Sequence, residues 1–286
     1  MAAELIDGKK LAAETRAQIA AGVAALKSEK GVTPGLAVIL VGDNPASVSY
    51  VTAKEKACVE AGMNSHEIRL SADISEKDLL AEIARLNADP AIHGILVQLP
   101  LPKGFDEKKV IDTIAPEKDV DGFTPVNVGR MLIGEDCFLP CTPHGIIKLI
   151  EVTGMKLAGK HAVVIGRSNI VCKPVAALLS RKSVNATVTL CHTGTPDVGA
   201  FTRQADVVVV AAGRPNTLTG DMLKPGAVVI DVGMNRNAEG KLCGDADYAS
   251  CEKVASWITP VPGGVGPMTI AMLMKNTIAC YLSRMA

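Results

Sequence analysis

The stretch His161–Leu179, HAVVIGRSNIVCKPVAALL, decides the fold, because a short apolar run stops at a glycine and a helical pattern follows it. The run HAVVI has the length and the β-branched content of a buried strand. Gly166 makes the turn, and the apolar residues after it recur at helical spacing. A strand, a tight turn and a helix in this order are typical of the first part of a dinucleotide-binding fold, where a pyrophosphate meets the N–H groups of the helix N-terminus.

The glycine pattern of this turn is incomplete. Where the dinucleotide-binding fingerprint G-x-G-x-x-G has three glycines, only Gly166 is present; Ser168 takes the second place and Cys172 stands close to the third. On the glycines alone, an ordinary turn between a strand and a helix remains an alternative.

The charges around this turn favour one cofactor. An NAD site usually places Asp or Glu at the end of the next strand to hold the ribose hydroxyls, but no acidic residue occurs from His161 to Pro196. The same window holds four basic residues, namely Arg167, Lys173, Arg181 and Lys182. A guanidinium group binds a 2′-phosphate bidentately. The sequence therefore predicts NADP, with its phosphate near Arg167 and the strand end Cys191–Thr193.

On both sides of this stretch, short apolar strands alternate with helical patterns, which indicates parallel sheets covered by helices. We expect an α/β fold of two domains: an N-terminal domain over residues 1–139 and a Rossmann-like domain over 140–268. The strongly apolar helix over 269–286 is expected to return to the first domain. We expect one long loop over 115–145, because that segment is dense in Gly, Pro, Asp and Asn. The expected strands cover 35–42, 64–70, 93–102, 161–166, 186–192, 206–213 and 227–233, and the clearest expected helices cover 8–29 and 75–89.

Composition excludes several classes of protein. The chain has 286 residues with 30 basic and 30 acidic side chains, so no net charge favours nucleic acid or a membrane surface as partner. Its first residues have neither a signal-peptide nor a transit-peptide pattern. Eight cysteines form no C-x-x-C pair, and no second pair follows Cys137 and Cys141. We therefore expect reduced thiols, a cytoplasmic protein and no metal site.

Tyr50 and Lys54 lie four residues apart in a predicted helix, so their side chains share one face. A phenol beside an ammonium group is a common arrangement for a proton donor near a reacting group. The alternative is a surface lysine that extends past a half-buried ring into solvent.

Seven segments together resemble one family. They are SYVTAKEKAC, GILVQLPLP, KDVDGF, PCTPHGI, VVIGRSNIV, IDVG and ITPVPGGVGPMT. In this order, and over nearly the whole chain, they are similar to the bifunctional methylenetetrahydrofolate dehydrogenase/methenyltetrahydrofolate cyclohydrolase family. The resemblance implies oxidation of 5,10-methylenetetrahydrofolate with NADP and hydrolysis of the methenyl product to 10-formyltetrahydrofolate. It also implies a homodimer that binds a folate substrate and serves one-carbon metabolism, including purine biosynthesis. The resemblance further implies that the domain over residues 1–139 is the folate-binding catalytic domain.

The resemblance also assigns residues. The implied catalytic residues are Lys54, Tyr50, Gln98 and Asp121. The implied substrate-binding residues are Tyr50, Gln98, Asp121, Pro262, Gly263 and Gly264. The implied cofactor-binding residues are Gly166, Arg167, Ser168, Thr193 and Val232. The family usually has glycine where this chain has Cys172, so we expect that side chain to weaken cofactor binding or to leave a reactive thiol at a helix start.

Other functions remain as alternatives. A short-chain dehydrogenase has a Tyr-x-x-x-Lys pair with the spacing of Tyr50 and Lys54, but there the nucleotide turn precedes the pair, and here the order is reversed. A nucleotide-binding regulator on the same fold would not need Gln98 and Asp121 as well. A family member with only one of the two activities is the third alternative.

Overall fold

The computed structural model describes residues 2–284, which form two compact units. The six-stranded unit contains the residues up to Ala12 and Thr142–Thr269. The three-stranded unit contains Ala13–Cys141 and the chain from Ile270 onward. The division falls inside two helices, α1 (Gly8–Lys30) and α10 (Val265–Ser283). Both units carry parallel sheets with helices, so the predicted α/β class is confirmed.

The six-stranded unit is built on one sheet in the order β1-β11-β8-β7-β5-β6, with every neighbouring pair parallel. From β5 the chain goes to β6 at the sheet edge and then returns to the other side of β5 for β7. Open α/β sheets bind ligands at the carboxyl ends of the strands where the order reverses in this way. The strands are β1 (Glu4–Leu5), β5 (His161–Ile165), β6 (Thr187–Cys191), β7 (Val207–Val210), β8 (Val228–Asp231) and β11 (Trp257–Ile258).

Valine-rich strands form the core of this unit. Every residue of β7 and β8 is buried, as expected for strands covered on both faces. Sequence analysis missed β1 and β11, because strands of two residues carry no periodicity. The remaining elements of the unit are α7 (Cys172–Ser180), α8 (Val198–Thr202), η1 (Gly220–Met222), β9 (Asn235–Arg236), β10 (Leu242–Cys243) and α9 (Tyr248–Cys251).

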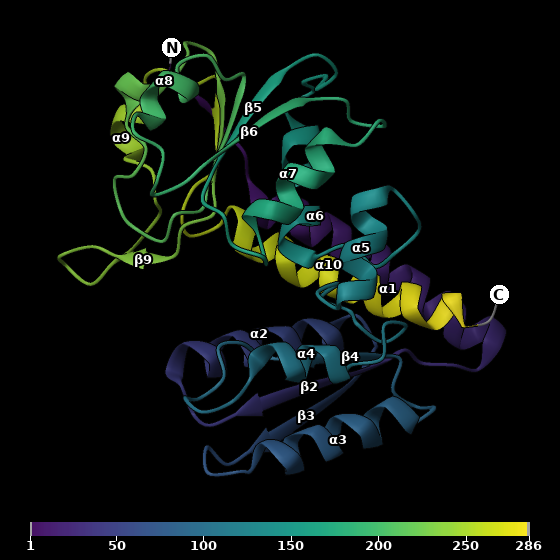
Figure 1. Cartoon of the computed structure of the whole chain (residues 1–286). Coiled ribbons are helices and arrows are strands. Elements are labelled where there is room, and N and C mark those ends of the chain that lie inside the picture. Colours follow the sequence, from purple (N-terminus) through teal and green to yellow (C-terminus); the bar gives the residue numbers. More distant parts are fainter. Residues whose placement is uncertain (1, 285–286) are drawn as a thin grey trace. The chain divides into compact units, whose positions relative to one another are not determined.

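The three-stranded unit has the parallel order β3-β2-β4, with the fully buried β2 in the centre (Figure 1). Beyond β4, Asp119 pairs with Ile95 through an isolated parallel bridge, so the chain near residue 119 runs alongside the sheet. The carboxyl ends of β2 and β4 therefore lie at one edge, beside the segment that follows Asp119. The elements are β2 (Gly35–Val41), α2 (Pro45–Glu60), β3 (Asn64–Leu70), α3 (Glu76–Ala88), β4 (Gly94–Val97) and α4 (Glu107–Thr113).

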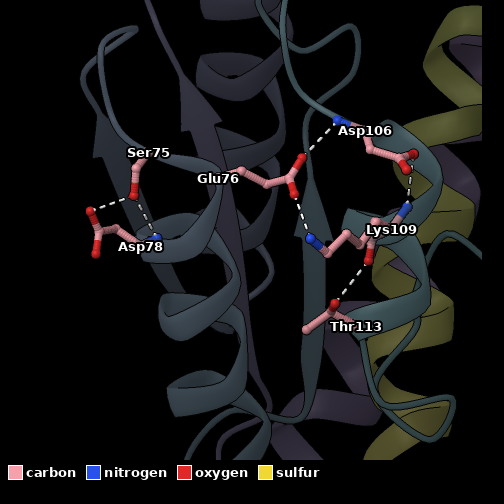
Figure 2. A network of polar contacts seen from close by, with 6 residues as sticks. All are labelled: Ser75, Glu76, Asp78, Asp106, Lys109 and Thr113. Atoms are coloured by element: carbon pink, nitrogen blue, oxygen red, sulfur yellow. Dashed lines mark hydrogen bonds and ion pairs between the residues drawn. The ribbon is translucent and has the colours of Figure 1, made fainter.

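Polar contacts tie the N-termini of α3 and α4 together (Figure 2). The Ser75 hydroxyl accepts a hydrogen bond from the Asp78 N–H at 3.1 Å and caps α3, as its sequence position predicts. Glu76, in the first turn of α3, accepts from the Asp106 N–H at 2.9 Å and pairs with Lys109 Nζ at 2.6 Å. These contacts fix the start of α4, and with it the end of the loop that leaves β4.

The expected loop over 115–145 is wrong in part, because two helices occupy much of it. Helix α5 (Pro125–Ile133) begins after Thr124, whose side chain caps it, and ends at Gly134 with φ +85°. Helix α6 (Cys141–Val152) begins before the segment ends. Proline in a first helical turn and glycine just after a last turn are ordinary helix boundaries. The proline and glycine at the two ends of α5 are among the residues whose composition predicts a loop.

The last part of α10 packs within the three-stranded unit. Asn276 Nδ2 donates to the carbonyl oxygens of Val120 at 2.8 Å and Leu139 at 2.9 Å. The Tyr281 ring meets the His93 ring edge-on, with centroids 5.1 Å apart. This half of α10 therefore supports the segment around Val120. Over the described residues, no helix combines the length and apolar character needed to cross a membrane.

Candidate active site

Lys54 lies on the buried face of α2. Ser47, Val51, Lys54 and Cys58 form one buried stripe at helical spacing. The Lys54 side chain is only 7% exposed, and its Nζ donates a hydrogen bond to Gln98 Oε1 at 2.9 Å. The alternative of a surface lysine reaching into solvent is therefore wrong.

Gln98 follows β4 directly, and both the oxygen and the nitrogen of its side-chain amide form hydrogen bonds. Its Oε1 accepts from Lys54, and its Nε2 donates to the Leu99 carbonyl oxygen at 2.6 Å. The loop beyond it is anchored because the Leu101 N–H donates to Glu107 Oε1 in the first turn of α4 at 3.0 Å. The amide oxygen of Gln98 is thus directed at the lysine by the fold itself.

Asp121 is the third member of this group. Burial raises the pKa of its carboxyl group to about 6, while the charge of Lys54 lowers that pKa and the charge of Asp119 raises it. An ionised carboxylate has two acceptor oxygens and can accept paired N–H donors in parallel.

Tyr50 lies one helical turn before Lys54 and is 37% exposed. Burial raises the pKa of its phenol, so the hydroxyl stays protonated at neutral pH. The ring is therefore partly accessible, one helical turn from Lys54. We name the group Lys54, Gln98 and Asp121 the lysine site.

Pro262, Gly263 and Gly264 belong to the six-stranded unit. Pro262 is exposed, whereas both glycines are buried. The Gly263 carbonyl oxygen accepts from the Lys9 N–H at 3.0 Å, and a Cβ on Gly8 would collide with the Gly264 carbonyl oxygen. Close packing against the start of α1 thus accounts for these glycines within their own unit, and their contact with substrate stays a prediction.

The nucleotide turn follows β5 at the point where the strand order reverses. Gly166 has φ +126°, and its N–H donates to the Cys191 carbonyl oxygen at 2.8 Å. A Cβ there would collide with the Ala211 carbonyl oxygen and with Cys172 Sγ. Only glycine fits this position.

The other predicted cofactor residues follow the carboxyl ends of strands in the same sheet. β5 and β6 pair in parallel through Ile165 and Cys191, so the exposed Arg167 and Ser168 come beside the exposed Thr193. Val232 follows β8, and its N–H donates to the Val210 carbonyl oxygen at 2.9 Å. An exposed guanidinium and hydroxyl groups at the start of α7, within a window without acids, fit a phosphorylated dinucleotide.

Cys172 differs from the expectation of a reactive thiol. Its side chain is fully buried, and its Sγ lies 3.5 Å from both the Ala211 carbonyl oxygen and Ser168 Oγ. Reactive cysteines are accessible, so the burial contradicts this expectation. The thiol fills space beneath the turn, where it contacts the position of Gly166.

Sequence reasoning missed several buried polar residues. Asp119 accepts hydrogen bonds from the residues around Asp121. The Cys141 thiol donates to the Val120 carbonyl oxygen at 3.2 Å, next to Asp121 in the chain. In the six-stranded unit, buried Asp231 accepts from the N–H groups of Asp245 and Ala246, each at 2.9 Å. In the sequence, these aspartates are marked only by their place beside or within apolar strands, and that place does not predict their hydrogen-bond partners.

A parallel α/β unit with a buried lysine site, together with a dinucleotide-type turn on a second parallel sheet, defines a nucleotide-dependent α/β enzyme. The chain belongs to the tetrahydrofolate dehydrogenase/cyclohydrolase family. The model of that family's catalytic domain matches residues 6–121, and the model of its NAD(P)-binding domain matches residues 140–285. Within residues 2–284, no cluster of three or more His, Cys, Asp and Glu side chains is arranged to hold a metal ion.

Known relatives resemble this chain over nearly its whole length. The bifunctional protein FolD of Acidovorax ebreus is 61% identical over 279 residues, which are 97% of this chain and 98% of that protein. A crystal structure of the bifunctional FolD enzyme from Campylobacter jejuni is 50% identical, with a TM-score of 0.96 over 99% of this chain and 100% of that one. The Trypanosoma brucei enzyme, solved with NADP cofactor and an inhibitor, is 39% identical, with a TM-score of 0.95 over 100% of this chain and 99% of that one.

Proposed function

We propose that this chain oxidises 5,10-methylenetetrahydrofolate to the methenyl compound with NADP and hydrolyses that compound to 10-formyltetrahydrofolate. The observation that carries the proposal is the lysine site, in which a buried Lys54 donates to Gln98 beside a carboxylate. Relatives named as bifunctional FolD proteins at about 60% identity support both activities.

Substrate binding is assigned to Asp121 and Tyr50. A pterin presents adjacent N–H donors, and a carboxylate accepts two of them in parallel. The face of Tyr50 packs against the aromatic part of the substrate, with the hydroxyl at its edge. Contacts of Pro262, Gly263 and Gly264 with the substrate are also part of the proposal.

In the oxidation, the bound NADP supplies the acceptor for a hydride that leaves the methylene carbon. The substrate becomes a methenyl cation, which an unpaired ammonium group would destabilise. Gln98 holds the Lys54 nitrogen through its amide oxygen, and Asp121 supplies a neighbouring negative charge. Both contacts keep the lysine oriented and reduce its opposition to the cation.

In the hydrolysis, water adds to the cationic carbon and gives up both of its protons. One proton goes to the amine whose bond to that carbon breaks as the ring opens, and the other goes to solvent. Lys54 is the proton carrier for this step, because it is buried and its nitrogen is directed by Gln98. Positioned proton transfer of this kind contributes about 10² to 10⁴ in rate. The same residue thus serves both reactions.

Cofactor binding is assigned to Gly166, Arg167, Ser168, Thr193 and Val232. Arg167 would pair with the 2′-phosphate, and the backbone at the start of α7 would receive the pyrophosphate. In this proposal the six-stranded unit is the cofactor domain and the three-stranded unit is the folate domain.

A homodimer and a cytoplasmic location complete the proposal. The buried cysteines Cys58, Cys172 and Cys191 are free thiols, as is usual in a reducing compartment. Light scattering coupled to gel filtration tests the dimer, which predicts twice the chain mass of 29.8 kDa.

The test of the function is a spectrophotometric assay of purified protein with 5,10-methylenetetrahydrofolate and either NADP or NAD. Formation of NADPH without accumulation of the methenyl compound is the expected result. Accumulation of the methenyl compound would identify the runner-up, a dehydrogenase without the second activity. Reduction of NAD alone would contradict the assignment of Arg167, and no turnover with either cofactor would refute the proposal.

A further inference from the structure

Asp119 is a buried carboxylate, 2% exposed, that accepts five hydrogen bonds. Its Oδ1 accepts from the N–H groups of Gly122 at 2.8 Å and Phe123 at 3.2 Å. Its Oδ2 accepts from the Thr124 N–H at 2.8 Å, the Thr124 hydroxyl at 2.7 Å and Asn127 Nδ2 at 2.9 Å. The carboxylate therefore closes a turn over residues 119–124, and Asp121 lies inside that turn.

The chain on both sides of Asp121 is held in place. Before it, the Val120 carbonyl oxygen accepts from Asn276 at 2.8 Å and lies 3.2 Å from Cys141 Sγ. After it, Gly122 has φ +69°, and a Cβ there would meet the backbone of Phe138. The position of Asp121 in the chain is thus fixed by this turn, and the turn is held by the carboxylate of Asp119.

The start of the turn is fixed as well. Lys118 is 1% exposed, and its Nζ donates to the carbonyl oxygens of Leu86 at 2.9 Å and Asp89 at 2.7 Å at the end of α3. The Ile95 N–H donates to the Lys118 carbonyl oxygen at 2.7 Å and joins the segment to β4. Asp119 is therefore attached to the sheet and reaches forward to the residues that follow Asp121.

We propose that Asp119 is a positioning residue that holds the turn over residues 119–124 and, through this turn, the position of the Asp121 carboxylate. The proposal rests on the role of Asp121 in the proposed function. Asp119 touches neither substrate nor cofactor in this account, and its effect passes through Asp121. The titratable groups that face Asp121 are Lys54 of α2, Asp119 of the same turn and Cys141 of α6.

The first experiment is an NMR titration of ¹³C-labelled aspartate carboxyl groups, which does not depend on turnover. The signal of Asp121 is identified as the carboxyl signal that is missing from the spectrum of the Asp121→Asn variant. In the native protein it should titrate near the pKa of about 6 that burial produces. Asp119→Asn should move this titration to lower pH, because a neighbouring negative charge is lost and the carboxylate becomes better hydrated.

Thr124→Ala separates position from charge. It leaves the Asp119 charge in place and removes only the hydroxyl donor at 2.7 Å. A smaller move of the Asp121 titration to lower pH is expected, because relief of burial, the largest cause of the raised pKa, outweighs the loss of the lowering effect of the Lys54 charge. This variant also serves if Asp119→Asn does not fold. An Asp121 titration unchanged in the variants that fold would overturn the proposal.

The second experiment is a double-mutant cycle of Asp119→Asn and Asp121→Asn, in which kcat/KM for 5,10-methylenetetrahydrofolate is measured. Asp119→Asn should lower kcat/KM by about tenfold to a hundredfold, as a misplaced binding group does, but less than about threefold in the Asp121→Asn background. Equal losses in both backgrounds would overturn the proposal. The matched control is Asp106→Asn, an exposed aspartate that accepts from the Lys109 N–H at 3.2 Å. If the native enzyme has no turnover, the proposed function fails and the NMR titration still decides the role of Asp119.

Discussion

Lys54 places an ammonium group in the buried stripe of α2, where it needs polar partners. Gln98 provides one at 2.9 Å. Gln98→Met keeps the length of the side chain but removes the acceptor, so kcat/KM should fall about 10- to 100-fold, the value of a hydrogen bond to a charged group. The control is Gln204→Met, an exposed residue whose amide donates to the Ala200 carbonyl oxygen. Steady-state kinetics with unchanged cofactor KM would confirm the prediction, and activity within twofold of the native value would contradict it.

The ionisation of Asp121 predicts how kcat/KM for 5,10-methylenetetrahydrofolate depends on pH. Burial raises its folded-state pKa to about 6, so the carboxylate is ionised at pH 7 and becomes protonated as the pH falls below about 6. Protonation removes the acceptor that binds paired N–H donors. We therefore predict that kcat/KM falls about tenfold per pH unit below pH 6, as for loss of one ionised group. A profile that stays flat down to pH 5 would contradict this assignment.

The sequence predicted individual site residues to different degrees. The spacing of Tyr50 and Lys54 predicted a shared helix face, but it did not show that Lys54 is buried and Tyr50 is 37% exposed. Gln98 lies 44 residues from Lys54 in the chain, so spacing says nothing of their contact. The five donors around Asp119 were equally invisible, since they depend on the path of a turn.

At the scale of elements, the start of α1 packs closely on the Gly263–Gly264 backbone in the same unit. A Cβ at Gly8 would collide with the Gly264 carbonyl oxygen, which cannot move aside as a flexible side chain would. Gly8→Ala should therefore lower the free energy of unfolding by about 1–3 kcal/mol, as overpacking does. Chemical denaturation measures this change.

The control for Gly8→Ala lies in the same helix. A Cβ at Gly22 meets no atom within 4 Å. Gly22→Ala should leave stability unchanged or raise it by up to about 1 kcal/mol, because alanine favours helix. If both variants had the same stability, the close approach of α1 and Gly264 would not be a constraint.

Elements were predictable where they carry a long apolar pattern. The apolar strands β2, β4, β5, β7 and β8 were expected from their runs of Val, Ile and Leu, and they are buried. Helix α5 was missed because its proline and glycine boundaries resemble loop composition. Strands β1 and β11 have two residues each, and only their place in the sheet defines them.

At the scale of the whole molecule, the account predicts a cofactor preference. Arg167 is exposed at the nucleotide turn, within a window that has no acidic residue. Arg167→Ala should reduce the preference for NADP over NAD about 10- to 100-fold, since it removes a charge-assisted hydrogen bond to the 2′-phosphate. Lys182→Ala, at another exposed cation of the window, is the control. An unchanged preference would place the phosphate elsewhere.

Function was predictable at this scale mainly through resemblance. The strand, turn and acid-free window indicated a phosphorylated dinucleotide, but no spacing argument indicates folate. The structure adds what the motifs lack, namely the contact of Lys54 with Gln98 and the turn that Asp119 holds around Asp121. Those contacts turn separate motifs into one site with a chemical role for each side chain.

The central claim is that Lys54 carries the proton in the hydrolysis. The direct measurement is the cyclohydrolase rate of Lys54→Met with 5,10-methenyltetrahydrofolate, without NADP. The control is Lys56→Met on the same helix, where the lysine side chain is 75% exposed and pairs with Glu60 at 3.9 Å. We predict a loss of about 10²- to 10⁴-fold for Lys54→Met and none for Lys56→Met. A folded Lys54→Met protein with full cyclohydrolase activity would contradict the account.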